Sequence, residues 1–255
     1  MSRLLVRELS GLSEFVAAQT VARQVWGFED RQLPSTFDLQ VVSHVGGMTA
    51  GAFLGGKLVG FVHGLPRTNL GRPCHHSHLL AVRPQFQGRG ISVRLKFFQR
   101  AWCLAKGIRR VTWTYDPLLV RNARLNLVRL RARANTFLPN VYGELGGLYG
   151  GLPTDRFEVH WDLDRSEVEK AARGSAPEPR DAEDLPRAST RHLPTARRVA
   201  MQIPAGAPGL YASDPAAARR ARTALRRTTG ALFDRGYEAV GLVVRRETAL
   251  YVFER

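Results

Sequence analysis

Hydrophobic residues recur with two different periods along the first third of the chain. A period of two predicts a strand, and a period near 3.6 predicts an amphipathic helix. By this rule the elements are a strand at 4–9, a helix at 13–27, a helical segment at 34–45, and strands at 48–54 and 58–65. Gly55 and Gly56 join the last two strands with the short glycine turn of a hairpin. A strand, two helices and the start of an antiparallel meander are therefore predicted.

A short apolar strand, a glycine-bearing loop and a helix come next. The apolar run at 76–82 is interpreted as a strand, because it is short and stops just before Pro84, which disfavours helix in the preceding residue. Ser92 can cap the helix that follows, and Gly107 ends it. The remaining elements up to Asp164 are a strand at 110–115, a helix at 121–131 and one further strand. These residues predict an α/β fold with a mixed α+β sheet.

The character of the chain changes after Asp164. A polar helix is predicted at 165–173, and residues 174–194 are rich in proline, alanine and mixed charge, as linkers are. A strand, a helix at 214–234 and two more strands follow. A piece of about sixty residues is near the lower limit for independent stability, so we expect it to dock on the first domain. The predicted domains are 1–164, a linker at 165–196, and a βαββ extension at 197–255.

The loop between the central strand and its helix carries the candidate chemistry. It consists of Gln87, Gly88, Arg89, Gly90, Ile91 and Ser92. Glycine lets the backbone take left-handed φ values and approach a ligand closely. Unpaired amides at a helix start attract anions, and the helix dipole adds positive potential there. Loops of this kind also occur for packing reasons alone, but the combination indicates a site for a phosphate or pyrophosphate.

The surrounding sequence resembles the acyl-CoA-binding motif of the GNAT superfamily of N-acetyltransferases. The resemblance rests on Leu80-Ala81-Val82-Arg83-Pro84, then Gln87-Gly88-Arg89-Gly90-Ile91-Ser92, then an amphipathic helix. The motif is usually Gln/Arg-x-x-Gly-x-Gly/Ala, and this chain has serine at its last place. The order of elements through Asp164 is also similar to the family. Segments 76–82, 113–118, 122–123 and 151–156 are similar to a poorly characterised branch of predicted acetyltransferases.

The resemblance implies an N-acyltransferase that moves an acetyl or succinyl group from CoA to a small-molecule amine by direct attack. Acetyl-CoA or another acyl-CoA would be the co-substrate, without a metal. The residues implied to hold it are Leu80, Val82, Gln87, Gly88, Arg89, Gly90, Ile91 and Ser92, with Asn122 and Asn126 as candidates for the pantetheine arm. Leu127 stands where the family commonly has a tyrosine that protonates the thiolate, so Tyr115, Tyr142 or water would take that role. Leu127 also motivates the alternative of a catalytically silent CoA-binding or regulatory module.

A base is needed to deprotonate the acceptor amine. Some family members carry a glutamate six residues ahead of the Val82 position, where this chain has His76. A histidine with a pKa near neutrality suits that role. His78 is expected on the same strand face, and Asp116 across the splay of the two neighbouring strands. The alternative is that the histidines are satisfied polar residues of a half-buried strand and that Asp116 caps a turn.

Two other parts of the chain are expected to shape the acceptor side. Trp26, Phe28 and Phe37 either line the acceptor pocket or pack in the core. The apolar face of the helix at 214–234 would close the acceptor cleft, which favours a small amine, and its arginines suit a carboxylate. The alternative for this extension is a homodimer contact.

Composition excludes several other classes. Cys74, His76 and His78 alternate on one strand about 6.5 Å apart, too far to converge easily on one ion, so no metal site is predicted. The net charge is +16, but the arginines are scattered, so we do not predict a nucleic-acid partner. No apolar run approaches the ~20 residues that span a bilayer, and no signal peptide is evident. With two cysteines expected to be free thiols, a cytoplasmic protein without membrane association is predicted.

Overall fold

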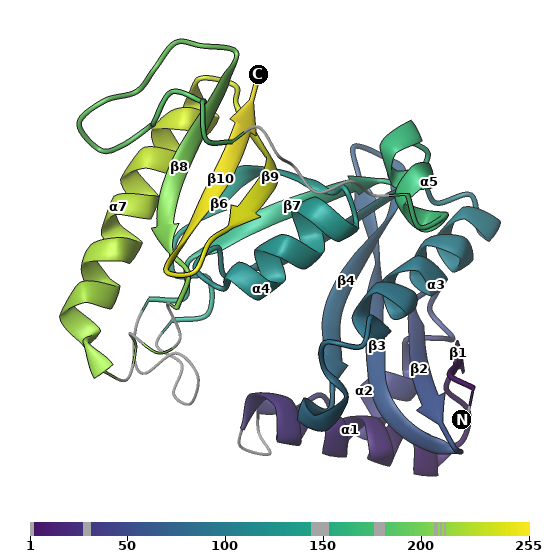
Figure 1. Cartoon of the computed structure of the whole chain (residues 1–255). Coiled ribbons are helices and arrows are strands. Elements are labelled where there is room, and N and C mark those ends of the chain that lie inside the picture. Colours follow the sequence, from purple (N-terminus) through teal and green to yellow (C-terminus); the bar gives the residue numbers. More distant parts are fainter. Residues whose placement is uncertain are drawn as a thin grey trace. The chain divides into compact units, whose positions relative to one another are not determined.

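The computed structural model describes residues 3–27, 32–143, 153–175, 182–206, 209, 211 and 213–255. They form two compact units (Figure 1). Unit 1 contains Met1–Trp113 and Asp162–Asp164, and unit 2 contains Thr114–Trp161 and Arg165–Arg255. No helix in these ranges is both long enough and apolar enough to cross a membrane.

Unit 1 follows the predicted order of elements closely. Its elements are β1 (Leu5–Glu8), α1 (Leu12–Trp26), α2 (Thr36–Val41), β2 (Met48–Leu54), β3 (Lys57–Asn69), β4 (Arg72–Val82), η2 (Pro84–Phe86), α3 (Ile91–Ala105) and β5 (Arg110–Tyr115). Strands β1 to β4 are antiparallel neighbours, and β4 pairs with β5 in parallel. The mixed α/β class predicted from the sequence is therefore confirmed.

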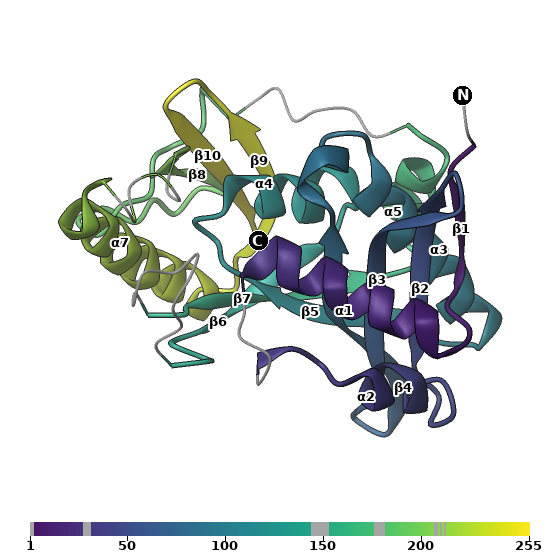
Figure 2. The ribbon, with the colours of Figure 1, turned by 90° about the horizontal axis from the view of Figure 1, so that it is seen from below.

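The sheet of unit 1 has a separate hydrophobic core on each face. Phe61 and Ala81 face the core that α1 and α2 cover, which includes Leu39. Val62 and Val82 face the opposite core, which α3 covers. Figures 1 and 2 show α1 and α3 on opposite faces of these strands. The alternation of side chains along each strand thus determines which helix each strand residue contacts.

The hairpin of β3 and β4 is longer than predicted. Pairing continues to Asn69 and Arg72, around a turn at Leu70 and Gly71. Prolines at 66 and 73 hid this extension, because proline inside a run argues against a central strand. Here both prolines lie in the part of the hairpin that extends beyond the pairing of β2 with β3, which stops at Met48 and Gly64.

A β-bulge interrupts β4 at His78. The register passes from His63–Leu79 to Gly64–Ser77, so His78 is an extra residue on its strand. Consequently, Ser77 and Leu80 both face α3, although strict alternation would put them on opposite faces. Gly64 lies directly beneath the ring of His75, and a Cβ at this glycine would collide with that ring. The sequence pattern did not reveal this bulge.

Unit 2 is built on a second group of neighbouring strands, in the order β7-β6-β9-β10-β8. Its elements are α4 (Val120–Ala123), η3 (Arg124–Arg129), β6 (Arg133–Leu138), β7 (Arg156–Asp162), α5 (Ser166–Ala172), β8 (Arg198–Pro204), α7 (Pro215–Asp234), β9 (Glu238–Val244) and β10 (Thr248–Glu254). The predicted order of a strand, a helix and two strands after residue 197 is confirmed. Between the helix predicted at 121–131 and Asp164, the structure has two strands, β6 and β7, where one was predicted.

The predicted boundary at Asp164 differs from the division seen in the structure, where the chain passes from unit 1 to unit 2 after Trp113. The C-terminal strands share a core with residues 114–161. β9 pairs with β6 at Ala134 and Ala239, and the Phe157 ring lies 5.7 Å from that of Tyr251 and 5.2 Å from that of Phe233. Residues 197–255 are thus an integral part of unit 2.

The helix predicted at 121–131 is present in an altered form. One α-helical turn, α4, passes directly into the π-helix η3, in which the Leu130 amide bonds the Leu125 carbonyl. The wider winding changes which residues share a face. Asn122 is exposed and Asn126 is buried, so the two asparagines do not lie in one environment as their spacing of four had suggested.

Candidate functional site

The loop that follows β4 is held in a defined shape by its own contacts. The Gln87 side chain donates from Nε2 to the Val82 carbonyl at 2.8 Å, which ties the loop to the end of the strand. Gly88 and Gly90 have φ of 79° and 74°, a region that side-chain-bearing residues rarely adopt. Both glycines are exposed. The predicted glycine geometry of the loop is therefore present.

Helix α3 begins at Ile91, and its N-cap is Gly90. No side chain bonds the first amides of the helix, so the prediction that Ser92 caps it was wrong. Ser92 instead lies in the first turn, because the left-handed Gly90 already turns the chain into the helix. The first-turn amides of a helix have no intrahelical acceptor, and here no cap competes for them. This corner can receive an anion.

Three arginines lie in the loop or next to it in the sequence. The Arg83 guanidinium donates from Nε to the Leu58 carbonyl at 2.9 Å, and the Arg89 guanidinium lies 5.5 Å from the centroid of the Phe86 ring. Arg94, in the first turn of α3, donates to the Leu4 carbonyl at 3.2 Å. These cations add positive potential where the helix dipole already favours a negative guest.

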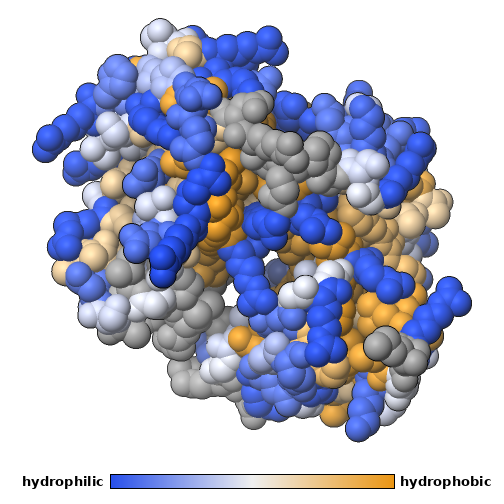
Figure 3. Space-filling model, in the orientation of Figure 1, coloured by the Kyte–Doolittle hydropathy of each residue, from blue (hydrophilic) through white to orange (hydrophobic). Residues whose placement is uncertain are grey.

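Positive charge is not confined to this loop. On the face shown in Figure 3, hydrophilic side chains are scattered, with hydrophobic ones between them. Helix α7 alone exposes Arg219, Arg220 and Arg227. These exposed arginines agree with the scattering of arginine along the sequence.

Strands β4 and β5 stay together for only a short distance. Within the described residues, their parallel pairing consists of His75 with Val111 and His76 with Thr112. Beyond this point β4 continues through the bulge to Leu80 and Val82, which contribute to the core beneath α3. We call the point where the pairing ends the fork. The backbone of β4 after the fork is free of β5 and can present amides to a ligand.

Three histidines gather on the face of the sheet that α1 and α2 cover. The His76 ring lies 6.2 Å from the His78 ring, which lies 6.2 Å from that of His63. His76 Nδ1 is 3.2 Å from Thr112 Oγ1, a hydroxyl that also accepts a hydrogen bond from Arg67 at 2.8 Å. The bulge brings His78 between the other two rings. His63 had no place in the predicted site.

The protonation of His63 follows from its contacts. Thr49 Oγ1 donates to the Leu39 carbonyl at 2.8 Å, so it accepts from His63 Nδ1, also at 2.8 Å. The Nε2 atom of His63 therefore carries the lone pair. Burial lowers the pKa of His63 to about 4, and it also lowers the pKa of His78 below its ordinary value. At neutral pH both rings are uncharged and able to accept a proton.

No group of three His, Cys, Asp or Glu side chains able to hold a metal ion occurs among the described residues. Cys74, which the alternation of the strand places with His76, is buried and lies next to the carbonyl of His75.

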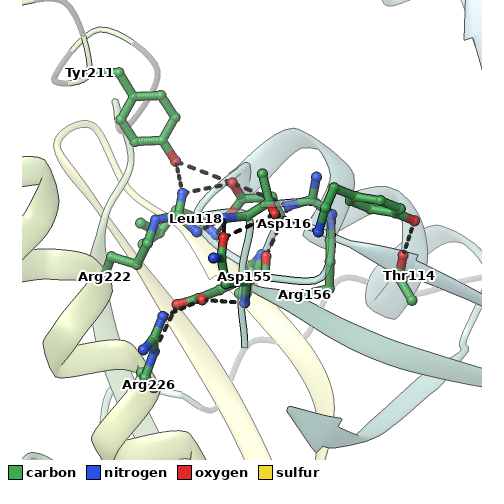
Figure 4. Close-up of polar contacts among 12 residues, drawn as sticks. Thr114, Asp116, Leu118, Asp155, Arg156, Tyr211, Arg222 and Arg226 are labelled. Carbon is green, nitrogen blue, oxygen red and sulfur yellow. Dashed lines mark hydrogen bonds and ion pairs between the residues drawn. The ribbon is translucent and has the colours of Figure 1, made fainter. Parts of the chain in front are cut away.

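Asp116 and Tyr115, both predicted to be catalytic, are buried in unit 2. The Asp116 carboxylate accepts from Arg222 Nη2 at 2.8 Å and from the Leu118 amide at 2.9 Å (Figure 4). Tyr211 lies 3.4 Å away from the same carboxylate. The Tyr115 hydroxyl is 3.3 Å from that of Tyr251, and burial raises its pKa. Asp116 is thus engaged in an ion pair rather than presented as a base.

The other predicted residues of unit 2 differ in exposure. Leu127 is fully buried, as a core residue would be. Tyr142 is 47% exposed, and its hydroxyl lies 3.4 Å from Thr114 Oγ1. Asn122 is exposed, so it is more accessible to a ligand than Asn126. Among the residues expected on the acceptor side, Phe37 is 77% exposed, Trp26 packs against the core, and Phe28 lies outside the described residues.

Sequence reasoning missed the buried charges. Lys96 of α3 is 2% exposed, and Arg222 of α7, the partner of Asp116, is equally buried. The signal for Lys96 was its position, because Lys96, Gln99 and Cys103 recur at helical spacing on the buried face of α3. Arg222 stands 106 residues from Asp116, and no local pattern links the two.

The chain is similar to known proteins in sequence and in fold. A sequence profile of the acetyltransferase (GNAT) family matches residues 14–125. The ribosomal-protein-S18-alanine N-acetyltransferase of Escherichia coli is similar in structure, with 14% identity and a TM-score of 0.51 over 64% of this chain and 96% of its own. An acetyltransferase of the GNAT family from Streptococcus pneumoniae has 14% identity and a TM-score of 0.50, over 62% and 98%.

A third similar structure is that of yncA from Salmonella typhimurium with its cofactor acetyl-CoA. It has 17% identity and a TM-score of 0.52, over 64% of this chain and 96% of its own. At such identities the likeness concerns the fold. No curated protein matches the sequence.

Proposed function

We propose that this chain is an acyltransferase that acetylates the amine of a small molecule, because residues 14–125 match the profile of the GNAT family of acetyltransferases. The observation that carries the proposal is the loop before α3. Its two left-handed glycines and the uncapped first turn of the helix offer backbone amides that can receive the pyrophosphate of CoA. The surrounding arginines favour the same guest.

The reaction needs three things of the protein. The acceptor nitrogen must lose a proton, the thioester oxygen must meet a donor, and the thiolate must regain a proton. In direct attack, the amine nitrogen bonds the acetyl carbon and the carbon–sulfur bond breaks. The proton released from nitrogen goes to a base, and the sulfur takes one from an acid or from water. The balance is one amide and one free thiol.

The β4 strand supports the first two requirements. His76 and His78 lie next to the fork, and an imidazole can accept the proton directly or through water. In the described residues, β4 pairs with β5 only up to His76, so we propose that an amide near Leu80 donates to the thioester oxygen. Each histidine is a candidate base, and His78 is the more exposed of the two.

The third requirement is an acid that returns a proton to the thiolate. Leu127 replaces the tyrosine that the family commonly uses, and Tyr115 is buried against Tyr251 with a raised pKa. We therefore propose water as the source of the proton that returns to sulfur.

Binding of the donor tests this proposal first. Isothermal calorimetry with acetyl-CoA and succinyl-CoA should give saturable binding, and Gly90→Asp should abolish it, since a carboxylate would repel the pyrophosphate. Gly107→Asp, at a left-handed glycine beyond the other end of α3, is the matched control and should keep the affinity. A folded wild-type chain that binds neither donor would remove the proposal.

A catalytically silent CoA-binding module is the alternative, favoured by the buried Leu127. Thiol release in the presence of a panel of amines separates the two. A chain that binds acetyl-CoA but releases no thiol with small amines, amino acids or peptides supports the silent module. Release with small amines but not with peptides supports the small-molecule acceptor.

A further inference from the structure

A buried polar cluster lies on the α3 face of β4, opposite the three histidines. Its centre is the Lys96 Nζ atom, which donates to Ser77 Oγ at 2.9 Å and to Gln99 Oε1 at 2.6 Å. The same atom lies 3.8 Å from the centroid of the Trp113 ring. An ammonium over an indole face is attracted by the electron density of the ring. Lys96 therefore contacts β4 through Ser77 and β5 through Trp113.

These contacts coincide with the fork. The last parallel pair joins His76 to Thr112, and Ser77 and Trp113 are the next residues on their two strands. In the described part of the chain, the two residues are linked through the Lys96 ammonium and not by the ladder. A shift of Ser77 would also move His78, the bulge residue that follows it. The position of Lys96 thus bears on the β4 amides beyond the fork.

The titratable groups around Lys96 are uncharged at neutral pH. Gln99 uses its oxygen for Lys96, so its nitrogen donates to His75 Nε2 at 3.0 Å. Burial, together with the charge of Lys96, lowers the pKa of His75 to about 3. Burial raises the pKa of Cys103 to about 12. Burial also lowers the pKa of Lys96 to about 7, so among these three groups Lys96 is the one that titrates near neutrality.

We propose that Lys96 is a positioning residue for acyl transfer, whose ammonium holds Ser77 and Trp113 at the fork and so sets the place of the β4 amides that receive the thioester. This inference rests on the proposed function for its catalytic part. The contact between Lys96 and Trp113 depends on the charge of Lys96, because a neutral amine is no longer attracted to the face of the indole ring. The contact with Trp113 should therefore weaken as the pH rises through the titration of Lys96.

A fluorescence titration of the full chain tests the contact itself. The emission of Trp113, taken as the difference between the wild type and Trp113→Phe, should change with a midpoint near pH 7. The midpoint should vanish in Lys96→Met. Lys106→Met is the matched control, since Lys106 is an exposed lysine at the end of the same helix and lies 5.1 Å from the centroid of the Trp102 ring. A Trp113 midpoint that persists in Lys96→Met would overturn the proposal.

Kinetics test the positioning. Lys96→Met should lower kcat/KM for acetyl-CoA by about tenfold to a hundredfold, the usual effect of a misplaced reacting group. Its affinity for desacetyl CoA should stay within about twofold of the wild type, because the phosphates bind at the loop. Unchanged kcat/KM would contradict the proposal. Lys96→Arg keeps the charge and should recover part of the rate.

The two proposals fail separately. If Lys96→Met does not fold, the pH titration of the wild type and of Trp113→Phe still decides whether the contact titrates. A wild-type chain without affinity for acetyl-CoA would remove the proposed function, whereas the fluorescence titration reports on the Lys96 contact in either case.

Discussion

Unit 1 and unit 2 each bury a cation in a hydrophobic core, but they neutralise it differently. Lys96 faces a hydroxyl, an amide oxygen and an indole ring, all of them uncharged. Arg222 faces the Asp116 carboxylate at 2.8 Å. Burial lowers the pKa of Lys96 to about 7. Burial acts against the charge of Arg222 as well, but Asp116 outweighs it and the pKa of Arg222 is raised.

Because of this difference, Lys96 can lose its proton near neutral pH, whereas Arg222 stays charged. Dipoles compensate a buried charge only in part, so the proton of Lys96 can leave near neutral pH. A carboxylate partner holds a guanidinium in its charged state, and the pair fastens α7 to the residue that follows β5. Figure 4 shows Asp155 held by Arg226 in the same way, next to the Asp116 pair. The fixed network stabilises unit 2, and the partly compensated lysine lies beside the proposed reaction site.

The largest effect is expected from breaking the fixed pair. Arg222→Met should lower the free energy of unfolding by about 3 kcal/mol, because it removes the nearer of the two cations beside the buried Asp116 carboxylate and leaves Arg156 Nη1 at 3.9 Å. Chemical denaturation monitored by circular dichroism measures this loss. Arg227→Met, at an exposed arginine of the same helix, should change stability by less than about 0.5 kcal/mol. Equal losses in the two variants would contradict the distinction.

Removal of the switchable cation should change the slope of stability with pH. The pKa of Lys96 falls from 10.5 in the unfolded chain to about 7, so the unfolded state binds the extra proton between these values. Wild-type stability should therefore rise with pH in that window, by about 1.4 kcal/mol per unit from this residue.

Lys96→Met should lose this contribution to the slope, which denaturation at pH 7, 8 and 9 measures. A double difference against Lys106→Met removes the other groups that titrate in the range. A Lys96→Met slope equal to that of the wild type would show that Lys96 is not the titrating group.

Acid should lower the free energy of unfolding of unit 1, because its buried histidines resist protonation. Burial lowers the pKa of His75 to about 3 and that of His63 to about 4, from 6.5. The unfolded chain takes up these protons first, so stability should fall below pH 6.5, by up to about 1.4 kcal/mol per unit for each residue. His75→Gln should make the decline between pH 6.5 and 4 shallower, and His192→Gln, at an exposed histidine, should not.

The smallest effect is expected at an exposed ion pair. Arg245 pairs with Glu183 on the surface of unit 2, where the two side chains are 48% and 50% exposed. Arg245→Gln should cost less than about 1 kcal/mol, and added salt should reduce even that. A loss comparable to that of Arg222→Met would mean that burial does not govern the strength of these pairs.

Local sequence signals were sufficient to predict an element when its boundaries depend on its own residues. Helix α7 runs from Pro215 to Asp234 as predicted, because Asp214 caps its first turn at 2.8 Å from the Ala217 amide and proline suits its first position. The left-handed glycines of the loop were equally predictable. The N-cap of α3 was not predictable in this way. Gly90 in the left-handed conformation occupies the N-cap position, whereas the sequence also offered a serine as a capping residue.

Contacts between distant segments were beyond the reach of these signals. The bulge at His78 depends on the register of β4 against β3, which no single strand encodes. The grouping of His63 with His76 and His78 follows from that register. The predicted boundary at Asp164 followed a change of composition, whereas the core of unit 2 is completed by strands that come later in the chain.

The sequence by itself thus determined the order of elements in unit 1, the match to the GNAT family profile, the left-handed glycines of the loop before α3 and the place of His76 and His78 on β4, because each depends on neighbouring residues. Only the tertiary structure decided which charges are buried and what compensates them. From the sequence alone, Asp116 is a candidate base, but in the structure it is paired with Arg222. From the sequence alone, Lys96 would be placed on the surface, but in the structure it contacts Ser77 and Trp113. Burial and partnership arise from packing between segments far apart in the chain, and they set the chemistry of an ionisable side chain.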